Sequence, residues 1–380
     1  MIQIKRHSEL ITEDEHSQLY QTRCQKAQLQ MQTAGVDALL LGASADLRYL
    51  SGYAAHASER LTCFVLPAQR EPVMVIPAFE APRLGKSPWF AVCPWTETQD
   101  PAVLVAEVLS DVAGRHLAVG DRMWAGFLLR LQRVLPGAKW LSATPLLREL
   151  RMIKSPEEIA ALRAAGAAVD AIFQEMLRRP WAGRSERGVG EEVSDLMRRA
   201  GCEAVDFVIV ASGPNGASPH HSNSNRMIQP GDAVVLDFGG PFGEGYYADI
   251  TRTVAVGYAS AELREVYAAV QAAQEAGVQA VRPGVLCQEV DAAARRLIVQ
   301  AGYGDYFTHR TGHGIGLDGH EEPYMVADNA LPLAAGMTFS VEPGIYLPGK
   351  LGVRIEDIVV CMEMGVERLN QASRDLLVVA

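Results

Sequence analysis

Residues 233–256 read AVVLDFGGPFGEGYYADITRTVAV, two apolar strand patterns joined by a glycine-rich turn. This pattern is typical of a β-hairpin. A hairpin symmetric about Gly243 places Asp237 directly opposite Asp249, since each lies six residues from that glycine. Directly opposed side chains have Cβ atoms about 5 Å apart, where two negative charges destabilise the pair. A cation between the two carboxylates would reverse the sign of that interaction.

Three more ionisable residues occur in the core-like stretches that follow. His313 lies in the glycine-rich stretch 311–316, Glu342 follows an apolar run, and Glu356 lies inside the run 352–360. Four carboxylates and an imidazole on core elements need partners, because an unpaired buried charge is very costly. Two divalent cations would balance the four negative charges. The set is rich in oxygen and lacks thiolate, which suits Mn²⁺ or Co²⁺ and tolerates Zn²⁺. The sequence therefore predicts a dinuclear metal hydrolase.

The bulk composition excludes several classes of protein. The chain has 380 residues, 48% hydrophobic and 21% charged, as expected for a globular protein of two domains. The net charge of −10 argues against a nucleic-acid-binding surface. No apolar run could span a bilayer, and residues 1–9 lack the apolar core of a signal peptide. The six cysteines form no Cys-x-x-Cys pair and are expected to be reduced. We therefore expect a cytoplasmic protein without nucleic-acid or membrane partners.

The first part of the chain alternates short apolar runs with helical patterns, which predicts an α/β domain over residues 1–150. The polar–aromatic stretch 46–53 is expected to be a packed turn. The expected strands are 38–41, 61–66, 73–76 and 117–119, and the expected helices are 22–34, 102–112 and 123–134.

A second domain is predicted over residues 151–380. It opens with a capping box, Ser155-Pro156-Glu157-Glu158, with proline at the first helical position. The strands that carry the ionisable residues follow or separate the helices, which indicates an α+β domain. The expected helices are the one after Ser155 and those at 186–200, 262–281 and 289–301.

With five motifs in order, the chain strongly resembles the pita-bread metallopeptidases, a family that includes prolidase, aminopeptidase P, methionine aminopeptidase and the metal-free creatinase. The first half is similar to the creatinase-type N-terminal domain, most recognisably at 47–52. The resemblance implies an α/β creatinase-like N-terminal domain plus an α+β pita-bread catalytic domain, and favours the prolidase and aminopeptidase P branch. The motifs are 235–239, 249–253, 312–317, 341–346 and 353–357.

The resemblance implies a role for each ionisable residue. Asp237 would chelate one metal ion, and Asp249 and Glu356 would bridge two. His313 and Glu342 would bind the second ion. The implied cofactors are two divalent ions per subunit, with Mn²⁺ favoured over Co²⁺ or Zn²⁺. Strand alternation agrees with Glu356, and not its neighbour, as the ligand.

Two histidines match the family's catalytic positions. His220 and His320 would donate hydrogen bonds to the substrate carbonyl and the developing oxyanion. Glu342 would assist proton transfer. His221 is adjacent to His220 and competes for its role, although the spacing favours His220.

Two residues are candidates for substrate binding. Arg354 would hold either a substrate carboxylate or the neighbouring carboxylates, including Glu356. Tyr324 is a candidate for the pocket wall.

Three functional readings remain open at this point. The favoured one is an Xaa-Pro dipeptidase, a proline preference that rests on the resemblance alone. The second is aminopeptidase P or a related hydrolase of a non-peptide C–N substrate. The third, a non-catalytic binding protein, is disfavoured because all five ligand residues are present. The resemblance also implies a homodimer that acts on small peptides.

Overall fold

The computed structural model describes residues 13–85, 88–112 and 116–380. Residues 1–9, on which the signal-peptide prediction falls, lie outside that part. The chain divides into two compact units, one ending at Arg151 and the other resuming at Met152. Within the described residues, no helix combines the length and the apolar character needed to cross a bilayer. All six cysteines are free thiols, as expected from their spacing.

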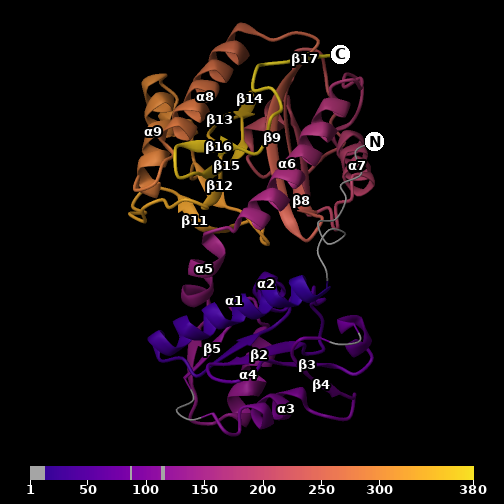
Figure 1. Cartoon of the computed structure of the whole chain (residues 1–380). Helices are drawn as coiled ribbons and strands as arrows, with labels where there is room; N and C mark the ends of the chain where they lie inside the picture. Colours follow the sequence, from indigo (N-terminus) through magenta and orange to yellow (C-terminus); the bar gives the residue numbers. More distant parts are fainter. Residues whose placement is uncertain (1–12, 86–87, 113–115) are drawn as a thin grey trace. The chain divides into compact units, whose positions relative to one another are not determined.

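The N-terminal unit is a mixed six-stranded sheet in the order β4-β3-β2-β1-β5-β6. Helices α1 and α2 lie on one face, and α3 and α4 on the other (Figure 1). Leu40, Val65 and Leu117 of the sheet form a core with Val105 and Leu131 of the helices. The bounds are α1 Glu13–Ala34, β1 Ala38–Leu41, α2 Ala45–Ser51, β2 Cys63–Pro67, β3 Val73–Pro77, β4 Ala91–Trp95, α3 Pro101–Val108, β5 His116–Val119, α4 Ala125–Val134, β6 Lys139–Ser142 and α5 Thr144–Met152.

One local prediction in this unit is wrong. The stretch 46–53 is mostly the short helix α2, not a turn. The Ser44 side chain accepts a hydrogen bond from the Leu47 N–H, which caps the helix start. Gly52 ends the helix in the left-handed conformation, with φ of 79°.

The second unit contains a four-stranded sheet (β17-β9-β8-β7), a five-stranded sheet (β11-β10-β12-β15-β16) and the hairpin β13-β14. Helices α6 and α7 lie on one side of the strands and α8 and α9 on the other (Figure 1). The bounds are α6 Pro156–Met176, α7 Glu186–Arg199, β7 Phe207–Ser212, β8 Ala233–Phe242, β9 Tyr246–Val256, α8 Ala261–Ala280, α9 Cys287–Gln300, β10 Gly312–Gly314, β11 Glu321–Met325, β12 Thr338–Val341, β13 Gly344–Leu347, β14 Leu351–Arg354, β15 Asp357–Cys361, β16 Val366–Arg368 and β17 Val378–Val379.

The alternation of side chains along β8 and β9 separates the core from the site. Leu236 and Phe238 of β8 pack with Ile250 of β9 against the helices α6 and α7. Side chains on a strand alternate between its two faces. Asp237 and Asp249 therefore lie on the face that turns away from α6 and α7.

The expected register of this hairpin is wrong by two residues. Asp237 pairs with Thr251, and Asp249 pairs with Gly239. The strand β8 continues to Phe242 and leaves a three-residue turn, in which Gly243 and Gly245 have φ of 59° and 88°. Those positive angles favour glycine, so the turn is centred on Glu244. A shift of two residues keeps the same face, so the two aspartates are diagonal neighbours.

The close packing of β10 yields a first prediction. A Cβ on Gly312 would lie 1.8 Å from the Ser340 backbone oxygen, so Gly312→Ala must push β10 away from β12. We expect it to lower the free energy of unfolding by about 3 kcal/mol. Thermal and urea unfolding measure this loss. Gly126→Ala is the control, because nothing lies within 4 Å of a Cβ there. An equally stable Gly312→Ala variant would contradict the packing.

Candidate metal centre

All five predicted ligand residues meet in one cavity. Its volume is about 830 Å³, and the second unit supplies its lining. Asp237 comes from β8, Asp249 from β9 and His313 from β10, while Glu342 follows β12 and Glu356 precedes β15. The cavity is lined by Asp206, Phe207, Val208, Ile209, Pro219, His220, His221, Ser222, Asp237, Asp249, His309, Arg310, His313, His320, Glu342, Arg354 and Glu356.

Three of the carboxylates carry a buried oxygen without a partner among the described residues. Asp237 Oδ1, Asp249 Oδ1 and Glu356 Oε1 accept no hydrogen bond there, although these residues are at most 8% exposed. Leaving a charged oxygen buried and unsatisfied costs several kcal/mol. Ligand atoms of Asp249, His313 and Glu356 also lie within 4.8 Å of one another. This spacing lets one cation satisfy several of them at once.

The protonation of His313 fits the same conclusion. Its Nδ1 is 3.1 Å from the Gly314 carbonyl, which must accept, so Nδ1 carries the hydrogen. Burial lowers the pKa of His313 to about 3, so Nε2 is bare. That lone pair faces Glu342 Oε1 at 3.3 Å and Asp249 Oδ2 at 3.8 Å. A bare imidazole nitrogen beside carboxylate oxygens is repulsive without a cation. The second nitrogen bonded to a backbone carbonyl is the usual arrangement of a ligating histidine.

The carboxylates themselves resist ionisation in this cavity. Burial raises the pKa of Asp249 well above its ordinary value, and the neighbouring Asp237 and Glu342 add to the shift. Burial and Asp249 do the same to Glu356. Burial also raises the pKa of Glu342 to about 7. Divalent cations would favour the ionised forms, so the residues present fit a metal centre.

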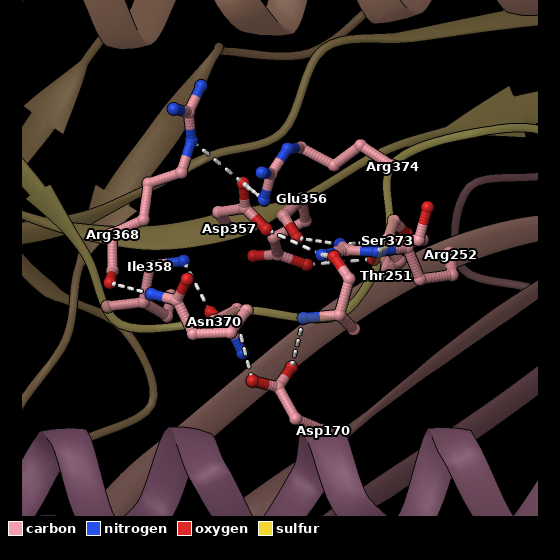
Figure 2. Close-up of polar contacts among 12 residues, drawn as sticks. Asp170, Thr251, Arg252, Glu356, Asp357, Ile358, Arg368, Asn370, Ser373 and Arg374 are labelled. Atoms are coloured by element: carbon pink, nitrogen blue, oxygen red, sulfur yellow. Dashed lines mark hydrogen bonds and ion pairs between the residues drawn. The ribbon is translucent and has the colours of Figure 1, made fainter.

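The segment that carries Glu356, directly before β15, is held from the opposite side. Glu356 faces the cavity, whereas the adjacent Asp357 turns away from it, as strand alternation predicts. Asp357 Oδ1 accepts from Arg252 at 2.7 Å, and its Oδ2 accepts from Arg374 at 3.1 Å and lies 3.3 Å from Arg368 (Figure 2). Arg252 also donates to the Glu356 backbone oxygen. These contacts fix the backbone of the proposed bridging residue.

A neighbouring segment ties both bridging positions together. Asn370 donates to the Asp249 backbone oxygen at 3.2 Å and accepts from the Ile358 N–H at 2.7 Å. Figure 2 shows Asn370 beside the Asp357 cluster, with Asp170 of α6 bonded to the same segment. The sheet and the segment after β16 therefore hold the site jointly.

The predicted catalytic histidines both line the cavity. The ring of His320 stacks on His313, with centroids 3.7 Å apart and an angle of 30°. His220 lies in the same wall, and so does His221. His221 differs in that its Nε2 is 2.8 Å from Glu186 Oε2. His221 is thus held by a carboxylate beneath the cavity wall.

Of the two substrate-binding candidates, Arg354 is part of the described cavity lining and Tyr324 is not. Arg354 donates to Asp237 Oδ2 at 2.6 Å and to the Tyr346 hydroxyl at 2.7 Å, and its Nε to Thr251 at 3.2 Å. Of the alternatives for Arg354, this structure has the carboxylate contact, with Asp237 and not Glu356 as the partner. Tyr324 is absent from the described cavity lining, and Arg310 lies over its ring at 4.3 Å.

Three residues near the histidines were missed by sequence reasoning. Glu186 is fully buried and accepts from Ser212, Asn215, Ser224 and His221. An acidic residue in the first turn of a helix normally marks only the helix start, so its sequence carried no further signal. His309 and Arg310 line the cavity beside His313. Their proximity to the glycine-rich histidine motif was the one available clue.

The family assignment follows from comparison with known proteins. The model of metallopeptidase family M24 matches residues 160–363, and that of the creatinase/prolidase N-terminal domain matches residues 23–153. The chain belongs to metallopeptidase family M24. This confirms the resemblance and the fold class, and the family implies a hydrolase that uses divalent metal ions.

Several M24 relatives cover nearly the whole chain. "Probable dipeptidase PepE" of Mycobacterium tuberculosis is 44% identical, over 96% of this chain and 97% of the relative. An Xaa-Pro dipeptidase of Lactobacillus helveticus is 33% identical, over 93% and 98%. The crystal structure of a prolidase from Thermococcus sibiricus has a TM-score of 0.91 and 37% identity, over 95% and 99%.

The buried charges predict a dependence of stability on metal. Chelation leaves the carboxylates buried without a counter-charge, so that they either repel one another or take up protons, and it should lower the melting temperature. Asp249→Asn removes one of those carboxylates and should narrow the difference in melting temperature between metal-loaded and metal-free protein. Calorimetry with metal content verified by elemental analysis measures both effects. Asp195→Asn, at an exposed carboxylate, should keep the full wild-type difference. Identical melting curves with and without metal would refute the charge argument.

A separate prediction concerns Glu186. Its hydrogen bonds lower its pKa to about 2 against the opposing effect of burial. Glu186→Gln presents an amide to groups that donate, and should cost about 3 kcal/mol at neutral pH.

The pH dependence of that loss has a definite sign. A pKa that is lower in the folded state gives stability that is complete above the ordinary value of 4.5 and is lost as the pH falls toward about 2. The stability difference between wild type and Glu186→Gln should therefore shrink from pH 5 to pH 3 in urea unfolding. Glu191→Gln, at an exposed position of the same helix, should change little at either pH. A difference that does not vary with pH would contradict the role of this charge.

Proposed function

We propose that this protein is a metal-dependent Xaa-Pro dipeptidase, which hydrolyses the peptide bond before proline in dipeptides. The observation that carries the proposal is a single cavity that holds three unpartnered carboxylate oxygens together with the bare Nε2 of His313. The M24 family membership and the dipeptidase relatives support the substrate class.

The proposed ligands are the five side chains that meet in the cavity. Asp237, Asp249 and Glu356 would hold one ion, and Asp249, Glu356, His313 and Glu342 the other. Their oxygen-rich chemistry favours Mn²⁺, with Co²⁺ or Zn²⁺ as alternatives. When bound, such ions lower the pKa of water and polarise the substrate carbonyl.

The protein's own groups would then orient the peptide and move protons. His220 and His320 would donate hydrogen bonds to the carbonyl oxygen as negative charge develops there. Glu342 would hold and release a proton as the peptide bond is cleaved. Arg354 would keep Asp237 oriented through the buried ion pair.

The proposal extends to the context of the enzyme. We assign residues 1–150 to the creatinase-type domain and 151–380 to the catalytic domain. We expect a cytoplasmic homodimer, in which the partner subunit's N-terminal domain limits the length of the peptide.

Substrate length tests the assignment directly. Metal-stripped protein is reloaded with Mn²⁺, Co²⁺ or Zn²⁺ and given Gly-Pro and Ala-Pro beside Xaa-Pro-Xaa tripeptides. We expect metal-dependent cleavage of the dipeptides alone. Preferential cleavage of tripeptides would indicate aminopeptidase P instead. No cleavage by protein with verified metal content would refute the proline-peptide assignment.

A further inference from the structure

Arg310 lies in the cavity wall with an uncommon pair of neighbours. Its Nη2 is 3.1 Å from Nδ1 of His320, and its guanidinium lies 4.3 Å above the centre of the Tyr324 ring. Among the described residues it contacts no carboxylate. The side chain is thus held between an aromatic face and an imidazole, within the site itself.

This contact decides the protonation of the His320 ring. A guanidinium has donors only and cannot accept a hydrogen bond. His320 Nδ1 must therefore be the acceptor, and the hydrogen of the neutral ring sits on Nε2. His313 shows the opposite arrangement, with its hydrogen on Nδ1 and its Nε2 bare.

The two stacked rings consequently carry different groups at their Nε2 atoms. With centroids 3.7 Å apart, the rings of His313 and His320 lie together in the cavity. His313 offers a lone pair, as a metal ligand must. His320 offers an N–H, as a donor to a carbonyl oxygen must. Had the two tautomers been alike, the site would lose either its ligand or its donor.

We propose that Arg310 is a positioning residue, which holds the His320 ring in the Nε2–H tautomer so that it donates to the substrate carbonyl oxygen. Arg310 acts through His320 and does not touch the reacting atoms. The stack on Tyr324 keeps the guanidinium in place, because cation–π contacts restrain a long side chain. The kinetic part of this proposal rests on the proposed function, whereas the tautomer does not.

The tautomer is measured first, on full-length protein labelled with ¹⁵N-histidine and loaded with Zn²⁺, which is diamagnetic. Long-range ¹H–¹⁵N spectra distinguish the two neutral tautomers, and His320→Gln assigns the signals of this ring. We expect a single Nε2–H form in the wild type. In Arg310→Met, which keeps an apolar chain over Tyr324, the Nδ1 signal should move toward the average of both forms. Arg310→Lys keeps a charged group that can only donate, and should restore the wild-type signal.

Steady-state kinetics on a cleaved Xaa-Pro dipeptide form the second readout. Loss of an oriented donor should lower kcat of Arg310→Met about tenfold or more, with KM within about twofold. Arg310→Lys should recover most of kcat. Arg163→Met is the matched control. The Arg163 side chain is half exposed, and it forms an ion pair with Glu367, which is distant in the sequence.

The outcomes separate this proposal from the proposed function. A wild-type ring with its hydrogen on Nδ1, or an unchanged His320 signal in Arg310→Met, would overturn the positioning role. A lower kcat with an unchanged tautomer would also overturn it, because Arg310 would then act on the substrate directly. If no dipeptide is cleaved, the spectra of the resting protein still decide the tautomer.

Discussion

Repulsion among carboxylates that share one buried cavity is the constraint on which this structure depends. Asp237, Asp249, Glu342 and Glu356 are forced together by the sheets, and burial weakens the screening that water would provide. Arg354 relieves part of this repulsion through its ion pair with Asp237. Three of the oxygens, Asp237 Oδ1, Asp249 Oδ1 and Glu356 Oε1, accept no hydrogen bond from the described part of the chain, so we expect cations to complete the site. We therefore expect metal binding and folding to be coupled in this unit.

Buried, hydrogen-bonded charges on the far side of the ligand residues hold the backbone in place against this repulsion. Asp357 and Arg252 form a fully buried ion pair directly behind Glu356. Arg252 also donates hydrogen bonds to backbone oxygens. Glu186 does the same for the segment that carries His220 and His221. Asp357 and Glu186 are thus buried charges whose oxygens accept hydrogen bonds from the protein, in contrast to the unpartnered oxygens of the ligand carboxylates. These hydrogen-bonded charges lie around the ligand carboxylates and limit how far those carboxylates can move apart.

The division between what the sequence predicts and what it does not has a physical basis. Strands such as 38–41 and the ionisable residues on apolar runs could be predicted, because a strand buried on both faces leaves a short continuous apolar run in the sequence. The hairpin register was wrong because symmetry about Gly243 ignores which glycines must take positive φ. The sequence-based charge balance omitted Arg354, whose partner lies 117 residues away. Glu186 and Arg310 escaped notice for the same reason, since their roles arise from contacts that no local pattern encodes.

The segment around Asn370 has a consequence for how the enzyme is made. Asn370 bonds to the backbone of Asp249 across 121 residues, and Arg252 bonds to Ala372 across 120. A ribosome releases Asp249 long before Asn370, so the nascent catalytic unit waits with its aspartates unsupported. Contacts of such long range form slowly. The metal site is consequently a late product of synthesis, and a chain stalled before this segment would display acidic strands without a finished binding site.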